Sequence, residues 1–226
     1  MNFTLEWILS LAALLLTFLC IVFLAKFTVN PIDSQGFSFK RVFPFEALKR
    51  REKVQSLYIF CLCLFAASAV LPLFNLITHP GEIENIKTLT VTVSSVFCIA
   101  AIIFGFLSYF DATHTKVHLI LFVLFLCFTL LGNALAAIRG VAIYKVYAEH
   151  NKQYVITLVG AVIWGLSALF CAILAVNPKL KNWAELEKVN NVYERPKVFV
   201  LAYYEWLIFF ALTIGQVGNL LVLLVQ

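Results

Sequence analysis

Six long apolar runs, separated by short polar segments, organise this chain of 226 residues. A helix needs about 20 mainly apolar residues to cross a hydrocarbon core of about 30 Å. Because lipid offers no hydrogen bonds to the backbone, such runs must be helices, and none shows the alternation of a β-barrel strand. We therefore predict an all-α fold without a sheet: a polytopic membrane protein, built as a bundle of six transmembrane helices. The spans are expected at 7–25, 54–78, 88–110, 117–138, 154–176 and 198–225, in a single transmembrane domain over residues 1–226.

The composition excludes other classes of protein. Hydrophobic residues make up 62% of the chain and charged residues 13%, whereas a soluble domain carries about 25% charged residues. Disordered, collagen-like and coiled-coil chains need polar, glycine- and proline-rich or heptad-charged sequences. The net charge is +5, but the lysines and arginines lie in short loops rather than on one solvated surface. Nucleic acid is therefore not an expected partner.

The basic residues predict how the chain is oriented in the membrane. The first, third and fifth loops contain thirteen basic residues, and the second and fourth contain four. Because lysine and arginine concentrate in cytoplasmic loops, we expect both termini on the non-cytoplasmic side. The first run follows Glu6, without a basic residue before it or a small-residue cleavage pattern after it. It is therefore expected to be an uncleaved helix rather than a signal peptide.

The first loop also has an apolar component. Between residues 37 and 53, aromatic side chains such as Phe39 and Phe43 alternate irregularly with basic residues. This pattern fits a stretch that lies on the membrane surface against anionic headgroups. It fits equally a basic loop whose apolar side chains pack on the ends of the helices.

Six cysteines invite a disulfide or metal framework, but all of them fall inside predicted spans. Cys61 and Cys63 are two residues apart, so on a helix they point about 200° away from each other and cannot share a metal ion. We expect these cysteines to be reduced thiols that face lipid or the bundle interior.

The densest polar cluster is formed by Asp111, His114 and His118. On a helix, this i, i+3, i+7 spacing aligns a carboxylate and two imidazoles, which are suitable ligands for zinc or iron. The third span must end and the fourth must begin within residues 111–118, however, so the segment is expected to be a turn. The alternative to a metal site is a set of interfacial residues satisfied by headgroups, water and helix ends, in which case no cofactor is expected.

Glu205 stands out because it interrupts the last apolar run. It lies eight residues after Lys197, or about 12 Å along a helix, where an unpaired carboxylate is costly. The fourth and sixth spans begin at the same membrane face, so His118 or His114 is the expected partner, while Arg139 at the end of the fourth span is expected to be too distant. The alternative is a structural hydrogen bond to an Asn, Ser or Tyr on a neighbouring helix.

Three short sequences resemble a known family. They are Val117-His118 at the start of the fourth span, Ala202-Tyr203-Tyr204-Glu205-Trp206 in the last span, and Asn30-Pro31-Ile32-Asp33-Ser34 with Gly36 after the first. They are similar to the six-span family of damage-regulated autophagy modulators and the related Sfk-type and FGF-receptor-activating membrane proteins. The resemblance implies a six-helix, non-enzymatic protein of membrane-lipid organisation, signalling scaffolds or trafficking, with both termini in the cytosol, opposite to the charge-based orientation.

These features favour a non-catalytic multi-pass membrane protein, either a lipid-organising or trafficking scaffold or an accessory subunit of a membrane assembly. Its expected partners are the lipid bilayer and other membrane subunits. One alternative is a metal-dependent lipid hydrolase that binds its metal with Asp111, His114 and His118 and uses Glu205 as general base. A small-molecule transporter is the second alternative.

Overall fold

The fold is a bundle of long apolar helices, described here from a computed structural model. The structure describes residues 5–27, 38–44, 84–110, 115–147, 155–189 and 192–225, and, between 56 and 70, residues 56, 59–60, 62–67 and 70. The helices are α1 (Leu5–Phe27), α4 (Glu84–Tyr109), α5 (Thr115–Tyr147), α6 (Val155–Ala175) and α7 (Val200–Val225), with a short 3-10 turn, η4 (Leu180–Asn182), and two strands, β1 (Glu187–Val189) and β2 (Val192–Glu194).

Four of the six predicted spans are present as helices that are long and apolar enough to cross a membrane, namely α4, α5, α6 and α7. At the place of the first predicted span, α1 is a helix of 23 residues, whose described side chains form a shorter apolar stretch over Ile8–Leu19. The second span, 54–78, lies largely outside the described residues, although 62–67 are helical. The chain is thus an all-α multi-pass membrane protein, and the full count of six spans stays a prediction.

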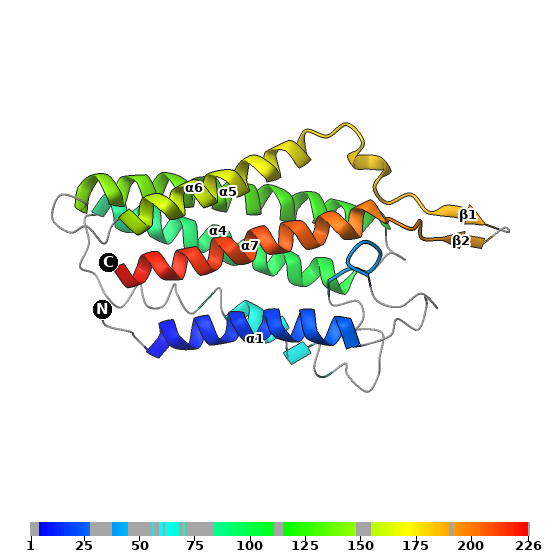
Figure 1. The fold of residues 1–226 in the computed structure, drawn as a ribbon, viewed down its shortest axis with the longest axis horizontal. Helices are drawn as coiled ribbons and strands as arrows, with labels where there is room; N and C mark the ends of the chain where they lie inside the picture. Colours follow the sequence, from blue (N-terminus) through cyan, green and yellow to red (C-terminus); the bar gives the residue numbers. More distant parts are fainter. Residues whose placement is uncertain are drawn as a thin grey trace.

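α7 lies at the centre of the bundle, with α4, α5 and α6 on one side and α1 on the other (Figure 1). The core of the bundle is aromatic: the rings of Phe65, Phe104 and Phe209 contact one another, with centroids 4.9 to 5.6 Å apart. α6 lies at the periphery and is the least buried of the four spans. α1 begins and α7 ends at the same end of the bundle, as an even number of spans requires (Figure 1).

The fourth predicted span, 117–138, was too short. α5 has 33 residues and continues to Tyr147, because Arg139 interrupts the apolar run without interrupting the helix. Arginine is a good helix former, and the apolar pattern resumes at Val141. Arg139 is therefore fully buried within α5, eight residues before the helix ends, rather than placed at a helix end.

The prediction that the chain lacks a sheet was wrong. β1 and β2 form a two-stranded antiparallel sheet in which Val189 pairs with Val192. This hairpin projects beyond the ends of the helices (Figure 1), so water can satisfy its free edges and the rule that excludes open sheets from lipid does not apply.

Candidate functional site

Glu205 and His118 meet between α7 and α5, as the sequence predicts. Nε2 of His118 lies 3.0 Å from Oε2 of Glu205, and the two side chains are 2% and 0% exposed. Nδ1 of His118 lies within hydrogen-bond distance of the carbonyl oxygen of Phe110, which directly follows α4. The last carbonyl groups of a helix have no partner within it. The imidazole therefore joins the end of α4 to the first turns of α5 and α7.

The two neighbours of the imidazole fix how many protons the pair can hold. A carbonyl oxygen only accepts hydrogen bonds, so Nδ1 of His118 must carry a hydrogen and donate it to Phe110. One further proton is then shared between Nε2 and Oε2. The pair is either imidazolium and carboxylate or neutral imidazole and carboxylic acid, and in both cases its net charge is zero. A neutral pair is the form in which two ionisable groups are least costly to bury.

The pair lies near the start of α7. α7 begins at Val200, so Glu205 is five residues, or about 8 Å, from the start of the helix. The expected depth of about 12 Å counted from Lys197, but residues 197–199 precede the helix. Burial of Glu205 therefore results from protein packed over it as well as from depth in the membrane.

The segment 38–44 provides that cover. The ring of Phe43 lies 4.5 Å from the imidazole of His118, centroid to centroid, and Phe43 is only 4% exposed. The indole Nε1 of Trp206 donates a hydrogen bond of 2.7 Å to the carbonyl oxygen of Val42. In Figure 1 this segment is the blue turn beside the start of α7. Within residues 38–44, the side chains of Val42 and Phe43 thus pack on the helix ends, as one of the two interpretations of the first loop predicts.

Two arginines hold the cover in place. Arg41 donates through Nη2 to the carbonyl oxygen of Arg195 at 3.1 Å, and Arg195 donates through Nη1 to that of Arg41 at 2.9 Å. The guanidinium of Arg195 also lies 5.3 and 5.4 Å from the ring centroids of Phe43 and Phe199. The backbone N–H of Phe199 donates to the carbonyl of Lys40 at 2.7 Å. The first and fifth loops are thereby joined over the His118–Glu205 pair.

The predicted metal site lies mostly outside the described residues, since neither Asp111 nor His114 is described. His118, the third proposed ligand, has a hydrogen-bond neighbour at each ring nitrogen, and a metal ion would have to displace one of them. In the part of the chain that the structure describes, no group of three His, Cys, Asp or Glu side chains is arranged to hold a metal ion. Zinc or iron binding by the three residues stays a prediction.

A second polar cluster, which the sequence did not predict, lies nearer the opposite end of the bundle. Nη1 of Arg139 donates to Oδ1 of Asn219, and Nδ2 of Asn219 donates to Oγ of Ser94 at 3.0 Å. The guanidinium of Arg139 also lies 5.6 Å from the ring centroid of Trp164. These four residues come from α5, α7, α4 and α6 respectively. The signal in the sequence was an arginine with apolar residues on both sides.

Other polar side chains and four thiols also lie within the helices of the bundle. Nδ2 of Asn133 donates to the carbonyl of Thr129 in its own helix, at 2.9 Å, and to that of Ala211 in α7, at 3.4 Å. Gln216, like Asn133 and Asn219, is buried. The cysteines within the described residues, Cys63, Cys98, Cys127 and Cys171, are free thiols, as predicted for them.

Comparison with protein-family models, with curated protein sequences and with solved structures finds no match for this chain. Its class therefore rests on its own residues and fold. Four long apolar helices packed around α7 define a multi-pass integral membrane protein.

Proposed function

We propose that this chain is a non-catalytic membrane scaffold that organises lipids around a rigid helical bundle. The observation that carries this proposal concerns His118 and Glu205, the pair best suited to acid–base chemistry: the two side chains are buried and join helices. Both nitrogens of the imidazole face protein atoms, and protein covers the pair. A general base needs room for a substrate or water within hydrogen-bond reach of it.

Two further features support a scaffold. The Arg139–Asn219–Ser94 cluster joins three helices, and Trp164 adds the fourth. Interhelical hydrogen bonds are each worth about 0.6 kcal/mol in membranes, so several of them stabilise one arrangement of the bundle. The resemblance to the autophagy-modulator family, which stays a prediction, implies the same class of function.

The test is purification of the full-length protein in mild detergent, followed by native mass spectrometry and a lipid-hydrolysis assay with added zinc. A scaffold is expected to retain lipids or membrane subunits at a defined ratio and to release no fatty acid from phospholipid vesicles. Hydrolysis that Glu205→Gln abolishes, and that the exposed-site control Glu185→Gln leaves intact, would establish the hydrolase instead. Substrate-dependent flux through reconstituted vesicles would establish a transporter.

A further inference from the structure

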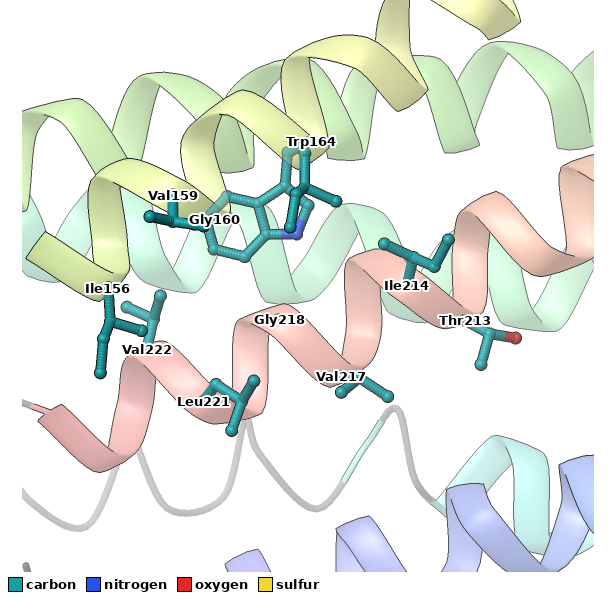
Figure 2. Close-up of a pocket in the computed structure, with 11 residues that line it drawn as sticks. Ile156, Val159, Gly160, Trp164, Thr213, Ile214, Val217, Gly218, Leu221 and Val222 are labelled. Carbon is teal, nitrogen blue, oxygen red and sulfur yellow. The ribbon is translucent and has the colours of Figure 1, made fainter.

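α6 and α7 leave an apolar groove between them near the end of the bundle at which α7 terminates. Its volume is about 350 Å³, within the range of about 300 to 1,000 Å³ of small-molecule sites. Figure 2 shows side chains from both helices around it. The lining residues are Ile156, Val159, Gly160, Ile163 and Trp164 of α6 and Thr213, Ile214, Val217, Gly218, Leu221 and Val222 of α7.

The side chains that line the groove are almost all apolar. Thr213 carries the one hydroxyl among the lining side chains, and its Oγ1 donates to the carbonyl of Phe209 in the same helix at 2.9 Å. The side chains of Val159 and Ile163 are 55% and 45% exposed on the outer surface of the bundle, which in a membrane faces lipid. A hydrocarbon occupant is therefore the chemical match.

The length and direction of the groove match one leaflet. Along α6 the lining runs from Ile156 to Trp164, about 12 Å, and along α7 from Thr213 to Val222, about 14 Å. Half of a hydrocarbon core of about 30 Å is about 15 Å. α6 begins at Val155, so the groove starts at the membrane boundary and follows the helices towards mid-depth, parallel to the lipid chains.

A transmembrane helix of a partner is a poor occupant, because the small residues of the groove are already used. A Cβ atom on Gly218 would lie 2.4 Å from Cζ2 of Trp164, and one on Gly160 would lie 3.1 Å from the same indole. Figure 2 shows the indole reaching from α6 towards Gly218. Helices dock closely where glycines expose the backbone, and here the indole of Trp164 packs against both glycines.

We propose that the groove binds one acyl chain of a membrane phospholipid, from the leaflet on the side at which α7 ends. This inference rests on the proposed lipid-organising function and names the lipid that the scaffold holds. The exposed Lys145, in the last turn of α5 at the same boundary, supplies a cation for the phosphate of the headgroup. Charge at the boundary and hydrocarbon below it together fit a phospholipid.

The experiment uses the full-length protein in phosphatidylcholine vesicles that contain a small fraction of phosphatidylcholine with a photoactivatable group in the acyl chain. Labelling is mapped by mass spectrometry and is expected to concentrate on groove residues such as Val217 and Leu221. Val159→Phe narrows the groove and is expected to reduce this labelling several-fold. Leu169→Phe is the matched control, since Leu169 lies on the same helix, is 56% exposed and does not line the groove.

A second measurement tests the same groove by fluorescence quenching instead of labelling. Phosphatidylcholine brominated in mid-chain is expected to quench more fluorescence in the natural protein than in Trp164→Phe, because the indole of Trp164 lines the groove. Equal quenching, or labelling spread evenly over the outer faces of α6 and α7, would overturn the proposal. Loss of labelling on addition of cholesterol but not of unlabelled phosphatidylcholine would assign the groove to a sterol.

The outcomes separate this inference from the proposed function. If labelling is spread evenly but the protein still retains lipids or subunits at a defined ratio, the groove proposal is refuted and the scaffold proposal stands. If the groove is labelled but the protein also releases fatty acid enzymatically, the scaffold proposal is refuted and the groove proposal stands.

Discussion

The pairing of His118 with Glu205 makes a sharp prediction, because two substitutions at one contact should have unequal costs. His118→Ala leaves the Glu205 carboxyl group without its imidazole partner, 0% exposed and under Phe43. Removal of one partner from a buried ion pair costs about 3 to 5 kcal/mol. Glu205→Gln, by contrast, keeps a hydrogen-bond donor opposite Nε2 while Nδ1 still donates to Phe110. Its expected cost is that of a neutral hydrogen-bond change, about 0.5 to 1.5 kcal/mol.

The assay is reversible unfolding of the purified protein in mixed micelles, with the two single variants and the double variant compared as a cycle. The double variant, which has neither the imidazole nor the charge, is expected to be more stable than His118→Ala alone. If Glu205→Gln destabilises the protein as much as His118→Ala does, the pair does not share one proton as inferred.

Two further predictions concern packing. Gly218→Ala places a Cβ 2.4 Å from the indole of Trp164 and should destabilise the protein by about 1 to 3 kcal/mol. Gly165→Ala on α6 is the matched control, because no atom lies within 4 Å of its Cβ position, and it should be neutral or stabilising by up to about 1 kcal/mol. Equal costs of the two substitutions in the same unfolding assay would contradict the packing. Trp206→Phe removes the donor to the carbonyl of Val42, so trypsin is expected to cleave at residues 40–41 faster than in the natural protein, and an unchanged rate would show that this hydrogen bond does not hold the segment.

The sequence predicted the parts of the fold that lipid constrains most strongly. A long apolar run has one solution in a membrane, so α6 and α7 begin and end within two residues of the predicted 154–176 and 198–225. The Glu205–His118 contact followed from the same rule, because spans four and six must begin at one face. Confirmation of the contact does not test a functional role for it, and that role stays a prediction.

The remaining features depend on information that an apolar run does not carry. Arg139 was assigned to a helix end because a charge ended the count of apolar residues, although burial of a guanidinium is decided by partners such as Asn219, 80 residues away in the sequence. The contact between Trp206 and Val42 spans 164 residues, and nothing local in either segment specifies it. The hairpin was missed because a rule for lipid was applied to a loop in water.

The arrangement of the polar clusters bears on why a groove opens between α6 and α7. α7 is joined to α5 by Glu205 at one end and to α4 and α5 by Asn219 near the other. The described link of α6 to the second cluster is the contact of the Trp164 ring with the guanidinium of Arg139. Helices in lipid gain no hydrophobic drive to close a gap, because lipid tails are as apolar as the side chains. The groove between α6 and α7 is lined by apolar side chains, so it is a place at which a lipid chain competes on equal terms with a helix.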